Sequence, residues 1–299
     1  MTPFSPVLTI HALGDFYQTV DPDEGPEPLR ETLAAVSRER FRRIDRYTQL
    51  ALIGSGRCVG DTGLDSDTGL YIGSRFASLS NTIAVHQQMV AGGAVPKPAN
   101  FINTLSNSAG YYVARNLGLD GRNLFVSRQD ASLIAALQLA GGDLAGGSIR
   151  QALVGVVDES SMPLEEHRRR LDVAPGTPLG EGSHWFRVCP HQRRASARDS
   201  EPGLATLSHL ATLANEEALS NWIREASVDG AAIWWPEQDS DVPSPVAYLP
   251  RYQPGLACYP SAMGGAIVRY LKGGQQQSLL LLATDGAHRY HGVRLDPAR

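Results

Sequence analysis

The sequence predicts an α/β protein whose sheet is covered by helices on both faces. Short apolar segments of strand length alternate with longer segments of helical spacing along most of the chain. Several helical segments end at glycines, as at Gly92, Gly118 and Gly146, which is a common way to stop a helix. With 299 residues, of which 42% are hydrophobic, the chain is long enough to bury a sizeable core.

In the first half, apolar alternation predicts strands and 3.6-residue spacing predicts helices. Residues 21–28 and 96–101 are predicted loops. The predicted strands are 7–12, 69–74, 124–127, 151–157 and 183–188, and the predicted helices are 41–56, 80–92, 106–117 and 131–144.

Two stretches without regular apolar spacing separate the later elements. Residues 159–178 are polar, and 195–202 have the composition of a flexible linker. We predict helices at 204–225 and 264–271, a strand at 230–235, and a final hairpin formed by 278–283 and 290–295.

Composition excludes several classes of protein. The net charge of −4 argues against a broadly basic nucleic-acid binder. Cys58, Cys189 and Cys258 form neither a disulfide framework nor a CxxC metal pair. The N-terminus lacks the basic region of a signal peptide, and no apolar run is long enough to span a membrane. We therefore expect a cytoplasmic protein without membrane insertion.

Six motifs follow one another along the chain: RRIDRY at 42–47, GLYIGS at 69–74, PANFINTLSN at 98–107, GLDGRN at 118–123, VGVVDE at 154–159 and LGEGS at 179–183. Their order and spacing resemble those of β-ketoacyl synthases of the thiolase fold, and the resemblance extends from residue 44 to residue 188. In character the chain is most similar to the branch of the family found in bacterial aryl-polyene pathways.

This resemblance implies a layered α-β-α-β-α fold of the thiolase type with a shortened C-terminal half. Residues 1–194 would form the ketoacyl-synthase-like N-terminal half, and 195–299 the remainder of the same domain. It also implies an active ketoacyl synthase as heterodimer partner, or a homodimer, with an acyl carrier protein as a further partner. No cofactor is implied.

The family's reactive cysteine is absent. A condensing enzyme needs a thiolate at a strand-to-helix turn, where the helix N-terminus lowers its pKa. Alignment on Gly121 places Asp130 at the cysteine, and a register shifted by one residue places Gln129 there instead. Glutamine at this position is typical of many chain-length factors. We interpret Asp130 as an N-cap of the following helix, because aspartate is among the best capping residues.

The family's two histidines are also replaced. The strand at 230–235 aligns with the strand that precedes the first histidine and leaves Trp235 or Pro236 there. The segment at 258–265 resembles G-H-x-x-G-A-A-G and leaves Tyr259 at the second. Whether the protein is an enzyme therefore stays open, although no catalytic residue is expected.

Other candidates for chemistry are weaker. His288 and His291 near Asp285 lack a clear third metal ligand, so we expect no metal. A pair of Cys189 with His184 or His191 would lie at a strand end, where no helix dipole activates the thiol. Glycine pairs such as Gly264-Gly265 indicate close packing, and Trp234-Trp235 indicates core or interface.

Two surfaces are implied for partners. By resemblance, the region 101–117 and the strand leading to Asp130 lie in the dimer interface. Phe101, Asn107, Tyr111 and Tyr112 would then border an acyl pocket, although ordinary helix packing is an equal alternative. Basic residues could face an acidic carrier, with a solvated charged surface as the alternative. They are Arg168, Arg169, Arg170, Arg187, Arg193, Arg194 and Arg198.

Three hypotheses for the function follow. The first is a non-catalytic, chain-length-factor-like partner of an active synthase in fatty-acid, polyketide or aryl-polyene assembly. The second is an enzyme of altered chemistry, a hydrolase, decarboxylase or acyltransferase, with Asp130 or a nearby histidine as base. The third is a stand-alone acyl-binding scaffold. Co-purification with a synthase separates the first from the third, and turnover abolished by Asp130→Asn would support the second.

Overall fold

The computed structural model describes residues 6–191, 202–228, 230–236 and 243–298, and these form one nine-stranded sheet with helices packed on it. The strand order is β3-β2-β4-β5-β1-β6-β9-β8-β7. The strands are β1 (Leu8–Thr19), β2 (Gly69–Gly73), β3 (Asn123–Val126), β4 (Ala152–Asp158), β5 (Gly180–Pro190), β6 (Ala205–Leu213), β7 (Ala232–Trp234), β8 (Leu279–Thr284) and β9 (Tyr290–Pro297). The helices are α1 (Arg30–Ala34), α2 (Arg46–Val59), α3 (Leu79–Gly92), α4 (Pro98–Ile102), α5 (Ser108–Leu117), α6 (Ser132–Ala145), α7 (Leu164–Leu171), α8 (Glu216–Ala226) and α9 (Ala262–Lys272).

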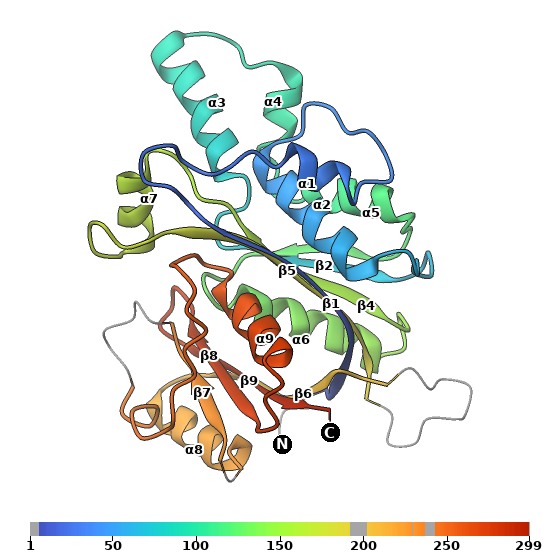
Figure 1. Cartoon of the computed structure of the whole chain (residues 1–299), viewed down its shortest axis with the longest axis vertical. Coiled ribbons are helices and arrows are strands. Elements are labelled where there is room, and N and C mark those ends of the chain that lie inside the picture. Colours follow the sequence, from blue (N-terminus) through green and yellow to red (C-terminus); the bar gives the residue numbers. More distant parts are fainter. Residues whose placement is uncertain (1–5, 192–201, 229, 237–242, 299) are drawn as a thin grey trace.

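The elements form five layers (Figure 1). Helices α2 and α5 cover the outer face of β1–β5, and α8 covers the outer face of β6–β9. Helices α6 and α9 lie between the two parts of the sheet. The predicted α/β class and the thiolase-like layering are therefore confirmed.

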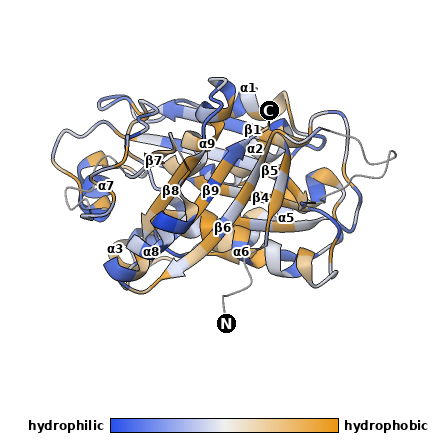
Figure 2. Ribbon diagram, turned by 90° about the horizontal axis from the view of Figure 1, so that it is seen from below, coloured by the Kyte–Doolittle hydropathy of each residue, from blue (hydrophilic) through white to orange (hydrophobic). Residues whose placement is uncertain are grey.

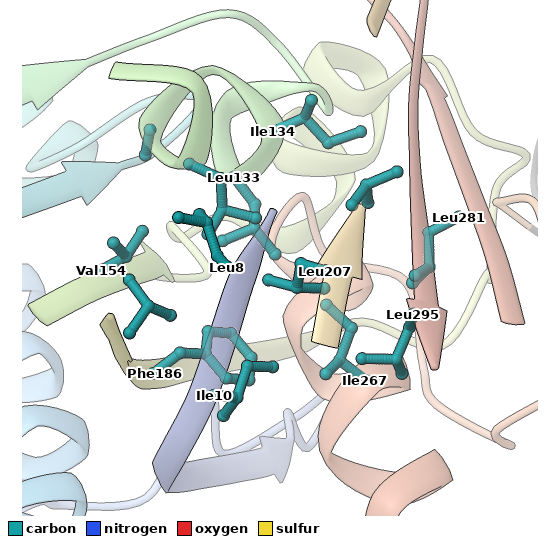
Figure 3. Packing of buried hydrophobic residues seen from close by; sticks show 14 of the residues in the cluster. Leu8, Ile10, Leu133, Ile134, Val154, Phe186, Leu207, Ile267, Leu281 and Leu295 are labelled. Carbon is teal, nitrogen blue, oxygen red and sulfur yellow. The ribbon is translucent and has the colours of Figure 1, made fainter. Parts of the chain in front are cut away.

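Alternation along the central strands sends side chains into both neighbouring layers. Leu153 and Val157 of β4 pack toward α2, whereas Val154 and Val156 pack toward α6. The strands that are buried on both faces are accordingly hydrophobic along their length (Figure 2). In Figure 3, Leu133 and Ile134 of α6 and Ile267 of α9 meet the strands of both halves in one core.

The predicted helix over 204–225 is wrong in its first part. Residues 205–213 form β6, and only 216–226 form a helix, which Asn215 caps. The register of β6 shifts between Ser208 and Ala211, where His209 has a φ of +54°. Leu207, Leu210 and Leu213 are three residues apart in the sequence, a spacing that resembles a helix, and the irregular strand buries all three.

Other differences are smaller. The predicted loop at 96–101 contains the short helix α4, which Pro98 begins. The polar stretch 159–178 contains α7, whose apolar residues Leu164 and Leu171 are buried. Within the described residues, no helix is long and apolar enough to cross a membrane. The predicted linker at 195–202 lies almost entirely outside the described residues.

Candidate functional site

The site lies where parallel strands end at one edge of the sheet. Strand β2 pairs in parallel with both β3 and β4, so the carboxyl ends of all three strands meet there. Ser74 and Arg75 follow β2, the turn at 127–131 follows β3, and Asp158 ends β4. Three segments that are distant in sequence thus converge.

The turn between β3 and α6 is fixed by hydrogen bonds to the end of β2. The Ser132 hydroxyl accepts a hydrogen bond from the Arg128 backbone N–H at 2.9 Å and lies 3.1 Å from the Ser74 carbonyl. Gln129 has a φ of +49°, in the left-handed region that non-glycine residues rarely adopt. Gln129 is therefore the residue that this turn holds in a strained conformation.

Asp130 does not cap α6, so that expectation is wrong. The N-cap residue is Ala131, without a side-chain capping bond. The Asp130 carboxylate instead accepts hydrogen bonds from Arg75 Nη1, at 3.2 Å to Oδ1 and 3.1 Å to Oδ2. A charge-assisted pair is stronger than a neutral capping bond, which explains the choice of partner.

A cavity of about 580 Å³ brings together the four positions singled out in the sequence, Gln129, Asp130, Trp235 and Tyr259. Its lining comes from both halves of the chain. Arg75 and Cys258, which sequence reasoning missed, line it as well, as do Pro236 and residues of the turn between β8 and β9. A basic residue directly after a core strand was the signal that could have revealed Arg75.

The cavity carries no activated nucleophile among the described residues. Burial raises the pKa of the Cys258 thiol to about 12, so it stays protonated at neutral pH. Burial raises the pKa of Asp130, and the Arg75 guanidinium opposes that rise. His288 is exposed and is the single histidine among the described residues of the lining.

Asp285 follows β8 in the turn to β9, and both of its carboxylate oxygens accept hydrogen bonds. Its Oδ2 accepts hydrogen bonds from His291 Nε2 and Arg289 Nε, both at 3.0 Å. Its Oδ1 accepts from the backbone N–H groups of Ala287 and Arg289. In the part of the chain that the structure describes, no three potential ligands gather to hold a metal ion.

Tyr259 is tied to a buried histidine. Its hydroxyl lies 3.0 Å from His184 Nε2, and His184 Nδ1 lies 2.9 Å from Asp15 Oδ1. Since both ring nitrogens of His184 are engaged, His184 does not pair with Cys189. His191 bonds Thr9 through Nδ1.

Residues of the family-like motifs anchor the loops around the site. Asp158 Oδ1 accepts hydrogen bonds from the Ser74 hydroxyl at 2.8 Å and the Arg75 N–H at 2.9 Å. Burial raises the pKa of Asp158 to about 7 and that of Glu159 to about 8. Arg46 Nε donates to the buried Glu181 at 2.9 Å. RRIDRY and LGEGS are therefore joined by an ion pair.

The predicted partner surfaces have mixed outcomes. Phe101 and Tyr111 are exposed, Asn107 is exposed beside α5, and Tyr112 packs against Phe41 at 5.5 Å between ring centroids. None of the four lines the cavity.

Arg168 is not available to an acidic carrier, contrary to expectation. It is buried and donates hydrogen bonds to the Thr177 carbonyl and to Glu165. Arg169 is exposed. Arg193, Arg194 and Arg198 lie outside the described residues.

Comparison with known proteins agrees with this architecture. Residues 21–168 match the family model of the beta-ketoacyl synthase N-terminal domain. No curated protein matches the chain. The ishigamide ketosynthase/chain length factor is similar at 19% identity and a TM-score of 0.73, with 98% of this chain and 100% of that chain covered.

Two further structures share the fold. A type II PKS acyl-carrier protein in complex with its ketosynthase matches at 11% identity and a TM-score of 0.70, over 98% of this chain and 100% of that one. The PfaC ketosynthase–chain length factor matches at 11% identity and a TM-score of 0.68, over 100% of this chain and 44% of that one. Residues 21–168 are therefore similar to a β-ketoacyl synthase N-terminal domain, and the chain has the thiolase-like α/β fold.

Proposed function

We propose that the chain is a non-catalytic ketoacyl-synthase homologue that acts, like a chain-length factor, as the partner of an active synthase. One observation carries this proposal: among the described residues, the lining of the cavity at the strand-to-helix turn holds neither a thiolate nor a buried histidine. Condensation requires an acylated thiolate and groups that stabilise an enolate. Gln129, Asp130, Trp235 and Tyr259 include no thiol that could carry the acyl group and no histidine.

The backbone favours Gln129 over Asp130 as the counterpart of the lost cysteine. A nucleophile at a strand-to-helix turn commonly sits on a strained residue, which displays its side chain. Gln129 has the left-handed φ and an exposed side chain, whereas Asp130 is paired with Arg75. The chain would then carry the residue that is typical of chain-length factors.

A protruding arm with a single charged residue supports the need for a partner subunit. We define the α3–α4 arm as residues 79–105, which project from the body of the molecule (Figure 1). Val85 is the single buried residue of α3, and Lys97 is the single charged residue from Leu79 to Ala114. A surface with few charges and many exposed apolar groups is typical of a protein interface. The exposed apolar groups of the arm are Met89, Val90, Val95, Phe101, Ile102 and Leu105.

The open edge of β3 lies at one end of the sheet and could extend it across a dimer. With the α3–α4 arm, it would form the face toward an active synthase. We place an acyl carrier protein as a second partner, with Arg169 among the basic residues that it would meet. An aryl-polyene or related pathway and a cytoplasmic location remain part of this proposal.

Co-expression with a synthase that retains one cysteine and two histidines tests the proposal by size-exclusion chromatography. A stable heterodimer is expected, together with no turnover of acyl-carrier thioesters by the isolated chain. Val90→Lys in the α3–α4 arm should weaken the complex. Leu139→Lys, at an exposed apolar position of α6, is the matched control. Turnover by the isolated chain, abolished by Asp130→Asn, would contradict the proposal.

The register at the turn has its own test. Gln129→Cys should react with iodoacetamide faster than Asp130→Cys, because the Gln129 side chain is exposed and that of Asp130 is partly enclosed. Equal or reversed rates would contradict the assignment of the cysteine position to Gln129.

A further inference from the structure

A chain of three hydrogen-bonding contacts leads from the protein surface to the wall of the cavity. Lys272 Nζ lies 3.1 Å from Asp15 Oδ2, and Asp15 Oδ1 lies 2.9 Å from His184 Nδ1. His184 Nε2 lies 3.0 Å from the Tyr259 hydroxyl. Lys272 is exposed, Asp15 is partly exposed, and His184 is fully buried. The contacts therefore run from solvent into the core.

The chemistry of the groups fixes the direction of each hydrogen bond. An ionised carboxylate only accepts, so His184 carries its proton on Nδ1 and donates it to Asp15. Nε2 of the neutral ring is then an acceptor, and Tyr259 donates its hydroxyl proton to it. Burial lowers the pKa of His184, and Asp15 opposes this effect, whereas Lys272 and Arg269 add to it. The imidazole is neutral in this arrangement.

Three glycines leave room for the His184 and Tyr259 side chains. A Cβ on Gly264 of α9 would lie 2.7 Å from the Cβ of His184, and one on Gly265 would collide with the Tyr259 hydroxyl. A Cβ on Gly182 of β5 would lie 2.6 Å from His184 Nε2. The backbones of α9 and β5 thus approach the histidine and tyrosine as closely as glycine permits.

Tyr259 stands between the histidine and the cavity. Tyr259 contributes to the cavity lining and His184 does not. The two ring centroids are 5.8 Å apart, and the tyrosine hydroxyl occupies the free nitrogen of the imidazole. A molecule in the cavity therefore meets the tyrosine and not the base behind it.

We propose that Asp15, His184 and Tyr259 form a masked general-base unit, in which Asp15 orients the His184 imidazole and Tyr259 shields it from the cavity. A carboxylate that holds an imidazole in one tautomer, with Nε2 directed at a hydroxyl group, is the arrangement that prepares histidine to accept a proton. A ligand hydroxyl or water molecule that replaced the tyrosine would meet such a base. If this fold had altered chemistry, His184 would serve it, because Asp130 is held by Arg75.

Carbethoxylation of histidines with diethyl pyrocarbonate, read by peptide mass spectrometry, tests the shielding. In the wild-type chain, His184 should react at least about tenfold more slowly than the exposed His288. Tyr259→Ala should bring the rate of His184 close to that of His288, whereas Tyr259→Phe, which keeps the ring, should leave His184 protected. Fast reaction in the wild type, or continued protection in a folded Tyr259→Ala variant, would overturn the proposal.

Nitrogen NMR of the histidines keeps the proposal testable if Tyr259→Ala does not fold. The wild-type His184 should be in the Nδ1–H tautomer. Tyr259→Phe removes the donor to Nε2, which favours the neutral ring, so the pKa of His184 should rise. A wild-type ring in the Nε2–H tautomer, or a pKa that Tyr259→Phe leaves unchanged, would contradict the unit. Neither experiment depends on a synthase partner, so its failure is distinguishable from failure of the proposed function.

Discussion

The first half of the chain, through β5, and the second half, from β6 onward, hold their strand ends in different ways. In the first half, the buried acids Asp158, Glu159 and Glu181 fix loops through backbone N–H groups and Arg46. In the second half, packing dominates: Trp234 and Trp235 are buried, and glycines let α9 lie against β5. Asp285, which acts within one turn, and Asp296, which accepts hydrogen bonds from Ser278 and Arg294, are exceptions there.

This difference explains where the family resemblance survives. Motifs whose side chains hold a loop cannot change without loss of that loop, so RRIDRY, VGVVDE and LGEGS remain recognisable. An end held by packing tolerates a change of side chain if volume is conserved. Trp235 and Tyr259, the residues expected at the positions of the two family histidines, lie in that second half and are buried.

The largest expected effect comes from the first half. Arg46→Ala leaves Glu181 buried without its charged partner, and loss of one member of a buried pair costs about 3–5 kcal/mol. Urea denaturation measures the free energy of unfolding. Arg115→Ala breaks the exposed pair with Glu39 and should change that free energy little. Similar changes in the free energy of unfolding for both variants would show that the Arg46–Glu181 pair does not stabilise the fold.

The buried acids also predict a pH dependence. The folded-state pKa values of about 7 for Asp158 and about 8 for Glu159 lie above the unfolded values, so the folded chain binds more protons. Their contribution is complete below pH 4 and is lost as the pH rises through 7 and 8. Stability should fall by about 2–3 kcal/mol between pH 6.5 and 8.5, with each fully bound proton worth about 1.4 kcal/mol per pH unit.

Denaturation curves across that pH range provide the measurement, and Asp158→Asn should flatten the dependence by removing one of the two titrations. Histidines with lowered pKa values, such as His184, add stability as the pH rises through their unfolded pKa of 6.5, and this opposing contribution is complete by about pH 7. The comparison with Asp158→Asn separates it from the contribution of the acids. A stability that rises from pH 6.5 to 8.5 would contradict the assignment.

In the second half, the sharpest test is steric. A Cβ on Gly264 would lie 2.6 Å from Val156 Cγ1, so Gly264→Ala should destabilise the chain by about 1–3 kcal/mol. Gly142 in α6 has no atom within 4 Å of an added Cβ. Gly142→Ala should therefore stabilise the chain by about 0.5–1 kcal/mol in the same thermal or urea assay. A change of stability in the same direction for both variants would show that α9 is not closely packed at Gly264.

The smallest effect concerns the cap of α8. The Asn215 side chain accepts a hydrogen bond from the Ala218 N–H at 2.9 Å, so Asn215→Ala should cost about 1 kcal/mol. Asn221→Ala, within the same helix, leaves the cap intact. Thermal denaturation compares the two, and a larger loss for Asn221→Ala would show that α8 depends on surface contacts and not on its cap.

Much of the fold was predictable because its strands and helices carry clear hydrophobic spacing. Strands β2, β4 and β8 are continuous apolar runs, and α6 follows the expected pattern. Strand β6 was not predictable, because the shift at His209 breaks the alternation that identifies a strand. The partner of Asp130 was also hidden, since Arg75 lies 55 positions away in the sequence.

The sequence by itself determined the fold class, the order of the motifs and the absence of cysteine from the strand-to-helix turn, because these depend on local spacing and residue identity. The tertiary structure alone decided that Gln129 takes the strained conformation, that Asp130 pairs with Arg75, and that Tyr259 covers His184. These features depend on segments that only folding brings together. Charge pairing and steric fit between those segments then override the conformation or partner that a single residue would prefer locally.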